Sequence, residues 1–168
     1  MKKFIYVVPL VFLAILAVQF FQSAKVEVDD SVKPYLERFL DLAIEKDHKV
    51  IYETYLHEHA LSLEEFSARM NYFANIFGAE PESYSYSRSY IGGVGYFIQY
   101  DLTLSDGKKH TCTFDFPARE ESMLVVEDLK QMSLSADFGE KSFLVDFKNG
   151  TVLACKAPEG CYGENQNN

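Results

Sequence analysis

The chain has 168 residues, of which 48% are hydrophobic and 15% aromatic, with 11 tyrosines, 14 phenylalanines and no tryptophan. Its formal net charge is −9, and residues 25–168 carry −11 because two lysines and no acidic residue precede them. So acidic a surface repels phosphate backbones and anionic lipid head groups, and we therefore expect no nucleic-acid partner.

The first 24 residues have the pattern of an export sequence. Lys2 and Lys3 precede an apolar run over residues 4–21, and polar residues follow it. The run is longer than the ~7–15 residues of a signal-peptide core and within the ~17–25 of a membrane span. Residues 1–24 are therefore expected to be a transmembrane anchor or a cleaved signal peptide. The predicted location is the bacterial inner membrane, single pass with the N-terminus inside and the domain in the periplasm, or secreted or periplasmic after cleavage.

A linker at residues 25–30 leads into three expected helices. Apolar residues recur at spacings of three and four over residues 31–46, which predicts one buried face. Asp47 can cap a second, shorter helix. The third helix has the clearest signals, because Ser62 and Glu65 form a capping box and Gly78 supplies a left-handed stop.

From Ser83 onward the apolar period changes to two, which predicts antiparallel strands. A three-residue loop ending in a left-handed Gly107 keeps two apolar strand faces together. This three-residue loop pairs Leu102 with His110, Tyr100 with Cys112 and Ile98 with Phe114. Residues Ser122–Leu134 are interpreted as a further strand with a bulge, with a helix as the open alternative.

The C-terminal part predicts a tighter hairpin and a disulfide. A two-residue turn at Asn149-Gly150 pairs Phe147 with Val152 and Val145 with Ala154. Cys155 and Cys161 bracket a turn containing Pro and Gly, and in an oxidising compartment we expect them to be bonded. Cys112 is then a buried, inert thiol. The domain is expected to span residues 31–157, with a polar tail at 158–168.

This order of elements is shared with a known superfamily. It is carried by Glu45-Lys46-Asp47-His48 with Tyr52 and Tyr55, by Leu61–Phe66, by Phe77-Gly78, and by the strand pair Gly95–Tyr100 and Thr111–Phe116. It resembles the cone-shaped nuclear-transport-factor-2-like superfamily, particularly its small exported bacterial members. The resemblance implies an α+β fold, in which three helices pack on a curved antiparallel sheet with a pocket on its concave face. A cystatin-like arrangement is the second choice. No activity is implied, since such cones host isomerases, dehydratases and binding modules.

The strongest candidate for a binding surface is a tyrosine stripe formed by Tyr84, Tyr86 and Tyr90 with Arg88. Tyr combines a large contact area with a polar tip, which suits recognition of a partner. If the turn at Gly92–Gly95 holds three residues, the stripe faces the pocket with Ile98; if it holds two, it joins Phe97 and Gln99 on the other face. The candidate binding residues are Tyr84, Tyr86, Arg88, Tyr90, Tyr96, Tyr100 and His110.

Catalytic and metal sites have weaker support. His110 lies on an apolar strand face, whereas Asp101 and Asp115 fall on the opposite one, so they cannot form an acid–base pair in one pocket. His57 and His59 point apart on a helix and have no third ligand nearby, so we expect a solvated loop.

The sequence therefore predicts a non-catalytic envelope protein without metal or cofactor. Its domain is expected to bind a protein partner, in an accessory or immunity role, or a small apolar ligand. The alternative is a cofactor-independent isomerase or lyase of the ketosteroid-isomerase type that uses His110 and tyrosines.

Overall fold

The computed structural model describes residues 32–92, 95–117, 129, 131–157 and 160–162. The leader predicted at residues 1–24 and the linker at 25–30 lie outside these ranges, as does most of the strand predicted at Ser122–Leu134. Among the described residues, no helix combines the length and the apolar character needed to cross a bilayer.

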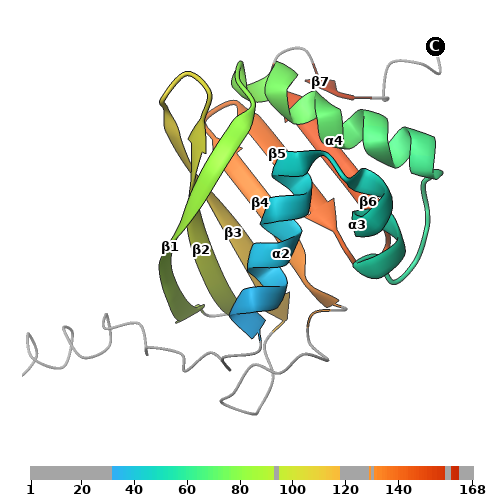
Figure 1. Ribbon diagram of the computed structural model, residues 1–168, viewed down its shortest axis with the longest axis horizontal. Helices are drawn as coiled ribbons and strands as arrows, with labels where there is room; N and C mark the ends of the chain where they lie inside the picture. The colour runs from blue at the N-terminus through green and yellow to red at the C-terminus, as the bar shows by residue number, and fades with distance from the viewer. Residues whose placement is uncertain (1–31, 93–94, 118–128, 130, 158–159, 163–168) are drawn as a thin grey trace, which may run out of the picture.

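Three helices pack on one face of an antiparallel sheet, which confirms the predicted α+β class (Figure 1). The helices are α2 (Val32–Glu45), α3 (His48–Thr54) and α4 (Leu63–Phe77). Every strand is hydrogen-bonded to its neighbour in the chain, so the sheet is a meander in the order β1 to β7. The strands are β1 (Pro81–Gly92), β2 (Gly95–Leu104), β3 (Lys109–Pro117), β4 (Ser133–Phe138), β5 (Lys141–Asp146), β6 (Thr151–Lys156) and β7 (Gly160–Cys161).

The predicted helix ends are formed by local side-chain contacts. The Asp47 carboxylate accepts a hydrogen bond from the Val50 N–H at 3.3 Å, and α3 begins there. Ser62 Oγ accepts from the Glu65 N–H at 3.2 Å at the start of α4. Gly78 ends that helix with a φ of 84°. These caps satisfy backbone groups that the helix leaves unpaired.

An aromatic cluster joins the helices to the centre of the sheet. Phe39 on α2 is fully buried, and its ring lies 5.9 Å from Phe114 on β3 and 5.0 Å from Phe147 after β5. Tyr55 meets the same ring edge-on at 5.3 Å. Such pairs contribute ~0.5–1.5 kcal/mol each beyond the area that they bury, so this cluster fixes where α2 lies on the sheet.

The register of β2 and β3 is the predicted one. Leu102 pairs with His110, and the same offset continues along both strands. Gly107 has a φ of 79°, as the three-residue loop requires. Alternating residues of both strands are consequently buried beneath the helices.

The predicted register of the second hairpin is wrong by two residues. Val145 pairs with Val152 instead of Ala154, and Asp146 pairs with Thr151, so residues 147–150 form a four-residue connection. The loop between α3 and α4 explains the longer turn, because its N–H groups use the carbonyls of this connection. His57, Glu58 and Ala60 donate to Phe147, Lys148 and Asn149 at 2.8, 3.1 and 3.3 Å, respectively.

Two other predicted boundaries also differ from the structure. The strand expected at Ser122–Leu134 overlaps β4 only at Ser133 and Leu134, because Leu129 and Gln131 lie in a short 3₁₀ turn. Gly160 and Cys161, expected in a polar tail, form β7 against β6. Cys155 and Cys161 are disulfide-bonded, the pair that the sequence analysis selects.

Candidate functional site

The tyrosine stripe is divided between the two faces of the sheet by an irregularity in β1. Tyr86 pairs with Tyr100, but two residues later Arg88 pairs with Gln99, so Ser87 is an extra residue in the ladder. A bulge of this kind exchanges the faces on which later side chains lie. Gly92 pairs with Gly95 across a two-residue connection. Each of the two expected orientations is therefore correct for one half of the stripe.

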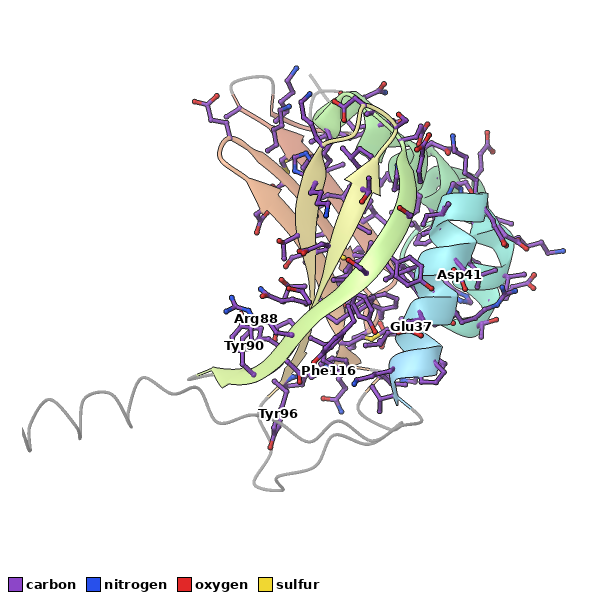
Figure 2. The ribbon with its side chains drawn as sticks, turned by 60° about the vertical axis from the view of Figure 1, so that its left-hand side comes forward. Glu37, Asp41, Arg88, Tyr90, Tyr96 and Phe116 are labelled. Carbon is purple, nitrogen blue, oxygen red and sulfur yellow. A yellow bond between two sulfur atoms is a disulfide. The ribbon has the colours of Figure 1, made fainter. Side chains whose placement is uncertain are left out.

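The first half of the stripe, Tyr84 and Tyr86, lies on the face of the sheet that contacts α2. The Tyr84 hydroxyl donates to the Asp41 carboxylate at 2.9 Å, and the Tyr100 hydroxyl lies 3.5 Å from the Glu37 carboxylate. Burial, followed by the hydrogen bond to Asp41, raises the pKa of Tyr84 to about 12. Tyr86 is exposed and stacks edge-on against Tyr100. Figure 2 shows Glu37 and Asp41 on the side of α2 that faces β1. These hydroxyls attach the edge of the sheet to the helix.

The second half of the stripe, Arg88 and Tyr90, lies on the sheet face opposite the helices. Tyr90 stacks on Phe97 with the ring centroids 5.0 Å apart, and the Arg88 guanidinium lies 5.0 Å from the Tyr90 centroid. Arg88 also donates to the Gln99 side chain at 2.6 Å. Tyr96, by contrast, is buried and lies on the same face of β2 as Ile98 and Tyr100. The seven predicted site residues therefore do not form one surface.

His110 is not among the described residues that line the pocket reported below, and its ring contacts α4 instead. Its ring packs edge-on against Phe77 of α4 at 5.1 Å, and burial lowers its pKa. Cys112 is a buried free cysteine. Burial raises the pKa of its thiol to about 12, as expected for an inert group. His59 stacks on Tyr52 at 4.2 Å in the loop before α4. No group of metal-binding side chains occurs among the described residues.

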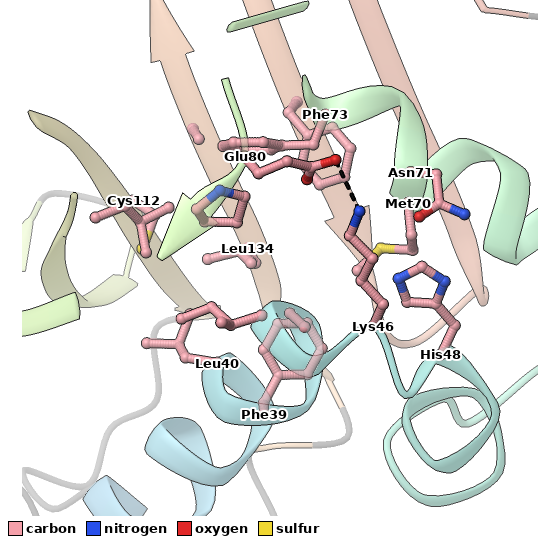
Figure 3. A pocket seen from close by; sticks show the side chains of 16 residues that line it. Phe39, Leu40, Lys46, His48, Met70, Asn71, Phe73, Glu80, Cys112 and Leu134 are labelled. Carbon is pink, nitrogen blue, oxygen red and sulfur yellow. Dashed lines mark hydrogen bonds and ion pairs between the residues drawn. The ribbon is translucent and has the colours of Figure 1, made fainter. Parts of the chain in front are cut away.

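A pocket lies between α2, the start of α3, α4 and the sheet (Figure 3). Its volume is about 50 Å³. One water needs ~10–15 Å³ of such space, so the pocket has room for about three to five waters or a few carbon atoms. The wall is apolar, whereas the rim is polar. The lining includes Phe39, Leu40, Met70, Phe73, Leu102, Cys112, Leu134, Ala136 and Phe143, with Lys46, His48, Asn71 and Glu80 as its polar members.

The corner between α2 and α3 positions the rim. Lys46 N–H donates to Ala43 O at 3.3 Å and Asp47 N–H donates to Leu42 O at 2.9 Å, the two bonds of a Schellman motif. Such a motif needs a left-handed residue, and Lys46 adopts this conformation with a φ of 60° where glycine is usual. Its ammonium binds the Glu80 carboxylate at 2.7 Å, and both side chains remain about half exposed.

His48 is the buried polar residue of this pocket. Its side chain is 7% exposed, and within the described part of the chain its ring makes no hydrogen bond. Burial lowers its pKa, and the Lys46 ammonium lowers it further, while Asp47 and Glu80 act in the opposite direction. The imidazole is therefore neutral at pH 7. Figure 3 shows its ring beside Lys46 and below Met70.

None of these rim residues is predicted as a site from the sequence. Lys46 and His48 flank a helix cap, and Glu80 lies 34 residues after Lys46 at the start of the sheet. Only the packing of α2 on β1 brings them together. A non-glycine residue at the end of α2, immediately before the Asp47 cap, was the available signal.

Comparison with protein-family models, with curated protein sequences and with solved structures finds no match to this chain.

Proposed function

We propose that the chain is a non-catalytic binding domain of the bacterial envelope that takes a small apolar group into the pocket between α2, α4 and the sheet. The expected leader at residues 1–24 would hold the domain at the membrane or export it. On this proposal the domain is a cone of the nuclear-transport-factor-2-like kind. Helices that cover one face of an antiparallel sheet support that assignment.

The observation that carries the proposal is an apolar pocket of about 50 Å³ inside a core that is otherwise filled by aromatic and aliphatic side chains. Well-packed interiors contain few voids larger than one water, and each costs stability. A pocket with an apolar wall and a few polar groups at its rim is the usual form of a small-molecule site. Its size limits the bound group to a short or branched chain of about four carbons.

Titration with a small neutral probe tests this function. Isobutanol has a branched chain of the right size, and a ligand of its size is expected to bind with a Kd of roughly millimolar or tighter. Met70 lines the pocket, and its methyl group provides an NMR signal, which should shift to saturation as isobutanol is added to the full chain.

Two enlarged variants provide the control. Ala136 lies in the pocket wall, so Ala136→Leu should fill the space and abolish the shift. Ala68→Leu adds the same atoms on α4, outside the residues that line the pocket, and should leave the shift unchanged. If Met70 responds to no small apolar probe, or responds equally in the Ala136→Leu variant, the proposed function is wrong.

The isomerase or lyase alternative is supported by a different histidine from the expected one. His48, not His110, lies in the pocket, and its lowered pKa keeps a neutral base there. The nearest carboxylate at the rim, Glu80, is already bound to Lys46. Exchange of a ligand's α-proton for deuterium, catalysed by the chain and lost in His48→Gln, would favour the enzyme over the binding domain.

A further inference from the structure

The rim of the pocket carries a cation in an otherwise acidic domain. Lys46 Nζ lies 2.7 Å from a Glu80 oxygen, so a carboxylate already occupies the position beside the ammonium. This contact is exposed on both sides, and exposed pairs of this kind are weak. A second carboxylate entering the pocket mouth can therefore displace Glu80 at little cost.

The buried imidazole beside it has unused hydrogen-bonding capacity. His48 is 7% exposed and lines the pocket, and its ring makes no hydrogen bond to the described residues. Its ring nitrogens keep some contact with solvent at the pocket mouth, and a neutral imidazole has one N–H to donate there. A carboxylate has two oxygens, so it can accept from His48 and from Lys46 together. An alcohol offers one oxygen for both.

The backbone holds Lys46 at this place despite a conformational cost. A left-handed residue other than glycine is disfavoured, by ~1–2 kcal/mol. Glycine would complete the same turn between α2 and α3 without that cost, but it would leave the rim without its ammonium. Strained residues of this kind are found at ligand-binding positions.

We propose that the ligand is a small branched-chain carboxylate, with its apolar chain in the pocket and its carboxylate held by Lys46 and His48 in place of Glu80. This inference rests on the proposed function and names its ligand class. Glu80 acts as an internal competitor that closes the rim when the pocket is empty.

Isobutyrate and isobutanol test the inference, because they share the same branched chain and differ in the polar end. The full chain should bind isobutyrate about fivefold more tightly than isobutanol, because the exchange of carboxylates at Lys46 is nearly neutral and the hydrogen bond from His48 is the net gain. Lys46→Gln should reduce this preference to about one. Glu80→Gln should increase isobutyrate affinity and leave isobutanol affinity unchanged. Both substituted side chains are about half exposed, so the fold is retained.

The outcomes separate this inference from the proposed function. If both probes bind with equal affinity, or if Lys46→Gln keeps the preference for the acid, the carboxylate assignment is wrong although the pocket still binds apolar groups. If neither probe shifts the Met70 methyl signal, the proposed function itself fails. A preference that Lys46→Gln removes and Glu80→Gln enhances supports the inference.

Discussion

Replacing Gly150 by alanine tests the contact between the β5–β6 connection and the loop that precedes α4. Gly150 has a φ of 64°, and a Cβ added there would overlap the Glu58 carbonyl oxygen and lie 2.8 Å from its carbon. Gly107 provides a matched control. Its φ is 79°, yet a Cβ at that position meets nothing within 4 Å.

The two substitutions share one cost and differ in another. Alanine in a left-handed conformation costs about 1–2 kcal/mol at either position. At Gly150 the loop must also move by at least about 1 Å, because the Glu58 carbonyl carbon has to reach an ordinary contact of ~3.5–4.0 Å and the carbonyl oxygen lies closer still. That movement breaks the three hydrogen bonds from His57, Glu58 and Ala60 to the connection. At ~0.5–1.5 kcal/mol each, they add about 1.5–4.5 kcal/mol.

We therefore expect Gly150→Ala to lower the free energy of unfolding by about 3–6 kcal/mol and Gly107→Ala by about 1–2 kcal/mol. Urea unfolding of the full chain, followed by tyrosine fluorescence because the chain contains no Trp, measures both. Equal losses for the two variants would refute the close approach of Gly150 to the loop, and with it the reason given for the four-residue turn.

Three further predictions concern single groups. Burial holds the pKa of His48 below its unfolded value, so the unfolded chain binds a proton more readily, and the free energy of unfolding should fall as pH drops from 7 toward 5. Urea titrations at several pH values should show a shallower fall for His48→Gln. An unchanged pH dependence in this variant would contradict a buried neutral ring. Tyr84→Phe removes the hydrogen bond to Asp41 and should cost about 1–2 kcal/mol in the same assay, whereas no loss would mean that water replaces it. The bond between Cys155 and Cys161 closes a short loop, so its removal in the double serine variant should cost about 2 kcal/mol; a destabilisation that persists when both proteins are compared under reducing conditions would point to the serines instead.

The elements predicted correctly depend on signals that lie close together in the sequence. Asp47 and Ser62 each cap a helix within three residues of their own position. The β2–β3 register follows from matching two apolar faces across a short loop, because a shift of one residue would place buried side chains in water. These choices need no information from distant parts of the chain.

The errors arise where distant contacts decide between locally equivalent arrangements. A two-residue and a four-residue turn keep the same alternation in β5 and β6, and the loop at residues 57–60 decides between them. The bulge at Ser87 has no sequence signal, because it lies in a run of alternating serines and tyrosines. The rim of the pocket likewise unites residues 34 positions apart, which no spacing rule selects.

The two margins of the meander differ in a way that bears on self-association. A long outermost strand normally presents unpaired backbone groups and can template fibril growth from one molecule to the next. The bulge in β1 bends that margin and rotates its later side chains, so a flat incoming segment would lose register at Ser87. At the opposite margin β7 offers only Gly160 and Cys161 and is covalently tied to its neighbour. The bulge and the short, disulfide-tethered β7 each shorten the straight unpaired edge that an incoming segment could extend.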